Sequence, residues 1–101
     1  MTYSVRFTEA AEQDLLLLFD FLAEQDAAAV QPAQADLAKA IEFLALFPFS
    51  CRKAEVSAAS PFLRELLIPF RSAGCVVMFE IGDAQTVTIF AVRQHREEDY
   101  H

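Results

Sequence analysis

The sequence has few of the residues that mark catalytic or metal-binding motifs. It contains two glycines, Gly74 and Gly82, so it has no glycine-rich phosphate-binding loop. Neither a GxSxG nor an HExxH motif occurs, and the two histidines and two scattered cysteines do not have the spacing of a zinc site. We therefore expect neither a metal nor a cofactor.

Long apolar runs are also missing. Asp20 and Glu24 interrupt the leucine-rich segment, which leaves no stretch of the roughly 18 apolar residues that a membrane span needs. Residues 1–7 alternate in polarity and do not resemble the apolar part of a secretion signal. These absences predict a soluble, cytoplasmic protein without membrane contact. In that compartment Cys51 and Cys75 are expected to be reduced, structural thiols, although one disulfide between them stays open.

Positive charge is scarce. The 101 residues suffice for one domain, 1–101, and carry a net charge of −7. A protein this acidic is not expected to bind nucleic acid strongly through its overall field. The charge is uneven, because residues 9–42 hold eight acids and only Lys39, whereas the second half is mildly basic. Any contact with nucleic acid would need a local patch or a protein partner.

A first helix is predicted from the end of a short N-terminal strand. Thr8 is the expected N-cap, and Glu9 and Glu12 suit the positive end of the helix dipole. Apolar residues recur at helical spacing over 11–22, which predicts a helix to about Gln25. The two glutamates are interpreted as a solvated face, since nothing else in the sequence supports a metal or catalytic role.

A second helix is predicted to follow, capped by Asp26 and ended by Pro48. Pro32 cannot donate a backbone N–H, so this helix either begins near Gln31 or is kinked one turn in. Residues 50–61 are expected to form a polar connector.

Four strands complete the prediction, because apolar and polar residues alternate or run together in short segments. They span Tyr3–Phe7, Phe62–Ile68, Cys75–Ile81 and Thr86–Arg93, with Gly82 expected to supply a positive φ in the last hairpin. The fold class is α+β: a β-α-α-β-β-β chain whose helical hairpin packs on a mainly antiparallel four-stranded sheet.

Two groups of side chains are not explained by packing of the fold alone and are candidates for a binding role. Leu17 and Phe21 widen the apolar face of the first helix, either to pack against both a helix and a sheet or to meet a partner. The second group consists of cations and polar residues in and after the strands: Arg64, Arg71, Arg93, His95, Arg96 and Tyr100. Strand alternation places Arg93 on the side of Val87 and Ile89. These arginines either pair with nearby acids or converge on one face that binds an acidic partner or phosphate.

Four segments resemble the ParE-type toxins of the RelE/ParE superfamily. They are the opening Tyr3–Leu15, the Phe47-Pro48 pair, the strand Leu63–Phe70 and the ending Ala91–Tyr100. The resemblance covers the whole chain and agrees with the predicted element order. It implies the toxin of a type II toxin–antitoxin pair, of the kind linked to plasmid stabilization, neutralised by a ParD-like antitoxin.

The resemblance leaves two targets open. ParE-type toxins inhibit DNA gyrase, whereas RelE-type toxins cleave mRNA on the ribosome. RNA cleavage needs an acid, a base and cations around the phosphate, and RelE-type nucleases are basic. The net charge of −7 therefore favours gyrase inhibition without catalysis. A third alternative is an inactive module that only binds antitoxin.

Each hypothesis assigns residues. If the protein is RelE-like, the catalytic set would be Arg64, Arg71, Arg93, His95 and Tyr100. If it inhibits gyrase, target binding and toxicity are assigned to Arg93, His95 and Arg96. The antitoxin is expected in an apolar groove over the helical hairpin and sheet edge, at Leu17, Phe21, Arg64 and Arg71.

Overall fold

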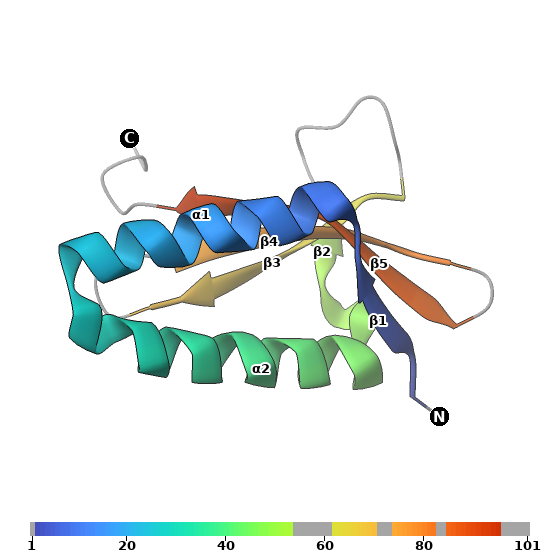
Figure 1. Cartoon of the computed structure of the whole chain (residues 1–101). Coiled ribbons are helices and arrows are strands. Elements are labelled where there is room, and N and C mark those ends of the chain that lie inside the picture. The colour runs from blue at the N-terminus through green and yellow to red at the C-terminus, as the bar shows by residue number, and fades with distance from the viewer. Residues whose placement is uncertain (1, 54–61, 71–73, 83–84, 96–101) are drawn as a thin grey trace.

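The described part of the chain forms two α-helices, two short 3₁₀ turns and five strands. The computed structural model describes residues 2–53, 62–70, 74–82 and 85–95. The elements are β1 (Ser4–Phe7), α1 (Glu9–Gln25), the 3₁₀ turn η1 (Ala27–Ala29), α2 (Val30–Leu46), the 3₁₀ turn η2 (Pro48–Ser50), β2 (Arg52–Lys53), β3 (Arg64–Pro69), β4 (Gly74–Ile81) and β5 (Thr86–His95) (Figure 1).

Thr8 and Asp26, the two cap residues predicted from the sequence, each accept a backbone N–H through their side chains. The Thr8 hydroxyl accepts the backbone N–H of Ala11 at 3.2 Å, which confirms Thr8 as the N-cap. At the other end, the Asp26 carboxylate accepts the N–H of Ala28 at 3.2 Å. Asp26 therefore caps η1, the short turn that leads into α2, rather than α2 itself.

The second helix begins before its proline. Because α2 starts at Val30, Pro32 lies in the first turn, where a backbone N–H has no partner within the helix. The helix ends at Leu46, where the N–H of Phe47 still reaches the carbonyl of Phe43 at 2.7 Å, and Pro48 opens η2.

The strands form one mixed sheet in the order β1-β5-β4-β3-β2. β1 runs parallel to β5, and the remaining pairs are antiparallel. The four predicted strands are confirmed. A fifth, β2, lies in the segment predicted as a polar connector, where Lys53 pairs with Arg64. At two residues it is too short to leave an alternating pattern in the sequence.

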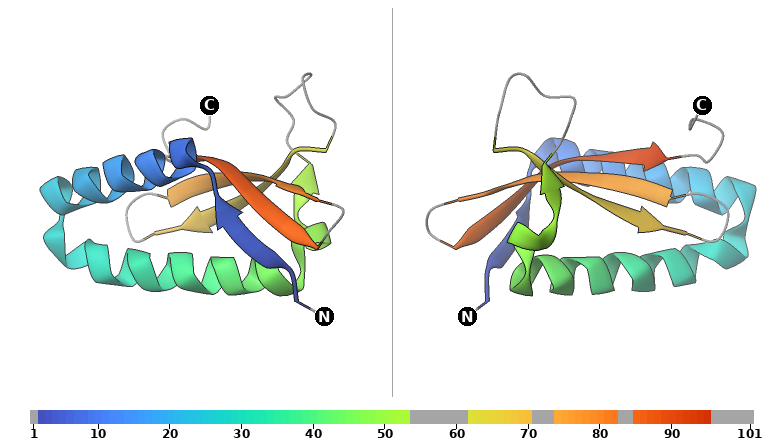
Figure 2. Two further views of the ribbon diagram at one scale, coloured as in Figure 1. Left: turned by 45° about the vertical axis from the view of Figure 1, so that its right-hand side comes forward. Right: turned by 180° about the vertical axis from the view of Figure 1, so that it is seen from behind.

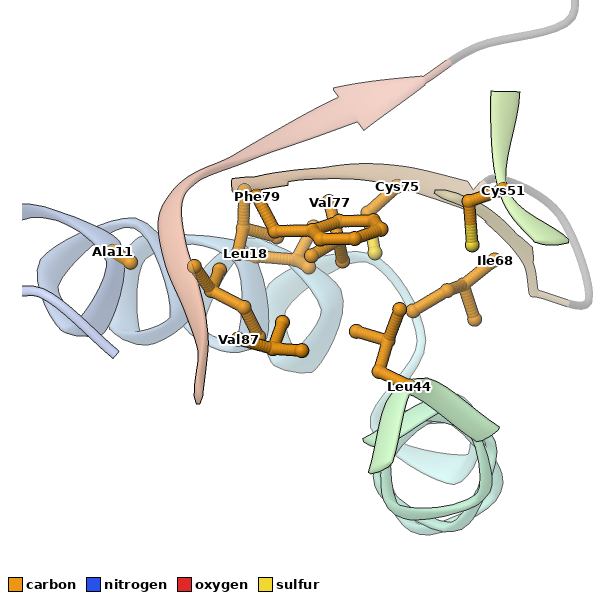
Figure 3. Close-up of a cluster of buried hydrophobic side chains, with 11 residues drawn as sticks. Ala11, Leu18, Leu44, Cys51, Ile68, Cys75, Val77, Phe79 and Val87 are labelled. Atoms are coloured by element: carbon orange, nitrogen blue, oxygen red, sulfur yellow. The ribbon is translucent and has the colours of Figure 1, made fainter. Parts of the chain in front are cut away.

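Both helices lie on the same face of the sheet, as the rear view in Figure 2 shows. α1 packs along β5, and α2 lies against β3 and β1. The core between the helices and the sheet is filled by Leu18 and Leu44 from the helices and by strand residues around Phe79, which is fully buried (Figure 3). No described helix covers the opposite face.

A β-bulge divides β5 into two parts. Phe79 pairs with Ile89 and Met78 with Ala91, so Phe90 is an extra residue without a partner on β4. The extra residue reverses the alternation. Val92, which is buried, therefore joins Ile89 on the helix-covered face. The prediction that Arg93 lies on the side of Val87 and Ile89 is wrong, because Arg93 is exposed on the opposite face.

The turn between β4 and β5 also differs from the prediction. The N–H of Gly82 donates to the Thr86 carbonyl at 2.6 Å, but Gly82 does not adopt a positive φ. Among the described residues, Gln85 does, with φ 61°. This left-handed conformation is unfavourable for a residue with a Cβ atom, by roughly 1–2 kcal/mol.

Replacing Gln85 by glycine is expected to stabilise the fold. Glycine removes the steric penalty but gains more freedom in the unfolded chain, so the net increase should be about 0.5–1 kcal/mol. The carbonyl of residue 85 would still accept the N–H of Ser4, as it does now at 2.9 Å. Thermal unfolding of Q85G beside Q85A would measure this. A lower Tm for Q85G than for Q85A would show that the backbone conformation carries no strain.

Candidate protein-interaction site

The C-terminal half of β5 has an open edge. β1 ends at Phe7, opposite Ile89, whereas β5 continues to His95. Beyond that point no described strand lies beside β5 on this side, and α1 runs past it instead. Between α1 and the strand lies a shallow groove of about 200 Å³, lined by Asp14, Leu17, Leu18, Phe21, Val92 and Gln94. We call it the α1–β5 groove.

Polar side chains of α1 and its cap take the place of the missing strand at the start of this edge. A carboxylate oxygen of Asp14 (Oδ2) accepts the backbone N–H of Val92 at 3.0 Å. The Thr8 hydroxyl donates to the carbonyl of Phe90 at 3.4 Å. Alternation along the strand then directs the backbone N–H and C=O of Gln94 to the same side. The groove thus has a polar main-chain wall formed by β5.

Its other wall is apolar. Leu17 is 68% exposed and Phe21 is half-buried, and both line the groove from α1. The neighbouring Leu16 is 62% exposed but lines a different hollow, between β1 and α1 beside Val5 and Phe7. Of the two exposed leucines, one therefore lines the groove and the other the hollow beside β1.

Arg64 holds the end of α2 against the sheet. Its Nη1 donates to the Cys51 carbonyl at 2.7 Å and to the Phe49 carbonyl at 3.4 Å. Its guanidinium carbon lies 5.3 Å from the centre of the Phe49 ring, which in turn contacts Tyr3 edge-on. Arg64 therefore connects β3 to η2, at the far edge of the sheet from the α1–β5 groove.

Two of the arginines predicted to converge, Arg64 and Arg93, are on opposite faces of the sheet. Arg64 alternates with Leu66 and the buried Ile68, which places it on the helix-covered face. Arg93 lies on the other face because of the bulge at Phe90. The structure therefore does not bring Arg64 and Arg93 together.

The remaining candidates are only partly described. His95 is the last residue of β5, but its side chain is not among those that the structure describes. Arg71, Arg96 and Tyr100 lie outside the described residues.

A second apolar groove, of about 330 Å³, separates α2 from the edge strand β3. Asp36, Lys39 and Phe43 of α2 and residues 66–69 of β3 line it. β2 pairs only with the first two residues of β3, so this part of the edge also has no described strand beside it. The sequence-based expectation of a groove over the hairpin and sheet edge thus corresponds to two grooves, one at each end of the sheet.

Neither Cys51 nor Cys75 is suited to act as a nucleophile. Both are unpaired thiols within the core. Burial raises the pKa of Cys75 to about 12, and it also raises the pKa of Cys51, against a smaller opposite effect of the Arg64 charge. Both thiols stay protonated at neutral pH, so neither is a nucleophile there.

The described residues contain neither a metal-binding cluster nor a membrane-spanning helix. In the part of the chain that the structure describes, no three His, Cys, Asp or Glu side chains gather as a metal would need. None of the described helices is both long and apolar enough to cross a bilayer.

Sequence reasoning did not single out Asp14 as a site residue. It is one of eight acids in residues 9–42, and nothing in its local pattern distinguishes it. The signal lies in the unequal lengths of β1 and β5, with four and ten residues, which leave part of β5 for α1 to cover.

Comparisons with known proteins agree with this architecture. The fold is similar to that of the chromosomal ParDE toxin–antitoxin system from P. aeruginosa, with a TM-score of 0.65, 18% identity, and 94% of this chain and 97% of that chain covered. It is also similar to the toxin–antitoxin complex RelBE2 from Mycobacterium tuberculosis, with a TM-score of 0.56, 25% identity, and 95% and 100% covered. No curated protein sequence matches the chain.

The family is established by sequence. The model of the ParE toxin of the type II toxin–antitoxin system parDE matches residues 5–100. Because this match covers almost the whole chain, the protein belongs to the ParE family of toxins of type II toxin–antitoxin systems.

Proposed function

We propose that this toxin acts in the bacterial cytoplasm by inhibiting DNA gyrase, and that a ParD-like antitoxin neutralises it. The family match supports a toxin, and both similar structures are described as toxin–antitoxin assemblies. Gyrase is the target implied by the ParE-type resemblance, and the structure contributes one observation that bears on the choice of target.

That observation is the separation of Arg64 from Arg93. Cleavage of RNA at the 2′-hydroxyl requires several cations close to one phosphate. Arg64 is bonded to two carbonyls on the helix-covered face, and Arg93 is on the opposite face. Arg64 and Arg93 therefore cannot bind one phosphate together, and the net charge of −7 disfavours docking on ribosomal RNA.

RelE-like mRNA cleavage is the second candidate. The similarity to the RelBE2 complex at 25% identity favours it. It would require Arg71, Arg93, His95 and Tyr100 to supply the catalytic groups without Arg64, which is engaged with η2.

For the antitoxin, the α1–β5 groove is the proposed docking site. An extended partner segment could pair with the open β5 edge at Gln94 while its apolar side chains contact Leu17 and Phe21. Arg64 and Arg71 remain proposed contacts for antitoxin carboxylates. Since Arg64 lies at the far edge of the sheet, a single antitoxin segment would have to cross the helical hairpin to reach both the α1–β5 groove and Arg64.

Two reactions with purified toxin test the proposed target. Gyrase supercoiling should be inhibited, and mRNA in a coupled translation reaction should remain intact. Codon-dependent cuts with normal supercoiling would favour the RelE-like alternative. No effect in either reaction, together with no growth arrest when the toxin is expressed without antitoxin, would indicate an inactive binding module.

A further inference from the structure

The helix-free face of the sheet carries a row of three side chains that lies outside the antitoxin site proposed above. Leu67 of β3 pairs with Val76 of β4, and Val76 pairs with Arg93 of β5. With adjacent strands about 4.8 Å apart, the row spans roughly 10 Å across the sheet. Leu67 and Arg93 are exposed and Val76 is partly buried between them. We call it the Leu67–Val76–Arg93 row.

The bulge at Phe90 creates this row. Without the extra residue, uninterrupted alternation would direct Arg93 toward the helices and Val92 toward the helix-free face. With it, Arg93 shares the exposed face with Val76, its partner on β4, and with Leu67 on the next strand. Bulges are frequent next to functional sites because they redirect a single side chain.

We infer that the Leu67–Val76–Arg93 row is the surface through which the toxin binds its target protein, by receiving a segment that presents an apolar side chain beside a carboxylate. The inference rests on the proposed function and deepens it, because it assigns Leu67 and Val76 to target binding. Leu67 and Val76 contact the apolar side chain, and Arg93 forms a two-pronged hydrogen bond with the carboxylate.

The charges on this face favour a protein over a nucleic acid. By strand register, its described ionisable side chains on β1 and β3–β5 are two cations, Arg6 and Arg93, and two carboxylates, Glu65 and Glu80. The charges of these described side chains balance, so together they supply no net positive field of the kind that a phosphate backbone requires. A single arginine beside apolar residues is instead the composition typical of energetically dominant positions in protein interfaces.

The carboxylates also orient the partner. Glu65 lies one row away from Leu67 on the same side of β3, and Glu80 lies two rows from Val76 along β4. Arg93 is the cation of the row, so a partner carboxylate is favoured at its Arg93 end rather than over the strands that carry Glu65 and Glu80. Because Arg93 and the groove residue Gln94 are on opposite sides of β5, this surface is distinct from the α1–β5 groove.

Charge reversal at two arginines of the same face tests the inference. R93E should raise the toxin concentration needed for half-inhibition of gyrase supercoiling at least roughly 10-fold, as expected for a dominant interface residue. V76T, which keeps the side-chain shape but replaces a methyl group by a hydroxyl, should raise it roughly 3- to 10-fold. R6E changes the same charge in a different row, beside Thr88, and should leave inhibition within about 2-fold. Equal Tm values and equal antitoxin affinity would show that all three variants are folded.

The outcomes separate the inference from the proposed function. If the unmodified toxin inhibits gyrase and R93E and V76T inhibit equally well, the row is not the target site, whereas gyrase inhibition stands. Equal losses for R6E and R93E would show a general charge effect and would also overturn the inference. If the unmodified toxin does not inhibit gyrase, the proposed function fails. In that case, loss of codon-dependent mRNA cleavage in R93E would assign this face to RNA instead of protein.

Discussion

Replacing Phe79 by alanine is expected to lower the free energy of unfolding by about 3–5 kcal/mol. Phe79 is fully buried and is the largest of the completely enclosed side chains between the sheet and the helices. Its removal deletes the contacts of an entire ring and leaves a cavity that the surrounding strands cannot close. Small domains have about 5–15 kcal/mol of stability in total, so a large part of it would be lost.

Chemical denaturation and thermal unfolding would measure this effect. At about 4–8 °C per kcal/mol for a domain of this size, Tm should fall by more than about 12 °C. F79L keeps most of the apolar volume and should lose less than about half as much. F62A removes the same ring from a position that is 71% exposed and should change stability by less than about 0.5 kcal/mol. A fall in Tm for F79A no larger than that for F62A would mean that the core is not centred on Phe79.

The sequence predicted where the helices and strands lie better than it predicted which face of the sheet each side chain occupies. The cap at Thr8, the periodicity of α1 and the apolar segments of β4 and β5 are local signals, and each element lies where they placed it. The bulge at Phe90 has no such signal, because Val87, Ile89 and Ala91 continue an unbroken alternation past it. One extra residue was enough to exchange the faces of Val92 and Arg93.

The site was predictable only where a surplus was visible in one element. The excess leucine and phenylalanine on α1 predicted either packing against both a helix and a sheet or a partner surface, and Leu17 is exposed in a groove. The partners of Arg64 could not be anticipated, because they are backbone carbonyls of Phe49 and Cys51 rather than acidic side chains. The bond from Val92 to Asp14 depends on where β1 stops relative to β5, a long-range property that no local pattern encodes.

Replacing Leu17 by glutamate is expected to weaken binding of the proposed ParD-like antitoxin roughly 100-fold or more. An apolar anchor of this size contributes about 1.5–3 kcal/mol when a partner covers it. A carboxylate in the same place must also lose its hydration when the partner covers it. Since Leu17 is 68% exposed in the free toxin, the fold should be unaffected.

Leu16 provides the matched control for this prediction. It is adjacent in α1 and 62% exposed, but it faces the hollow beside β1 rather than the α1–β5 groove. L16E therefore introduces the same charge on the same helix, about 100° around its axis, and should change antitoxin affinity by less than about 3-fold. Isothermal titration of both variants, with their Tm values, decides between a specific groove and a general effect of charge on α1. Equal weakening by L16E and L17E would move the antitoxin site away from the groove, because repulsion by an acidic helix would then account for both losses.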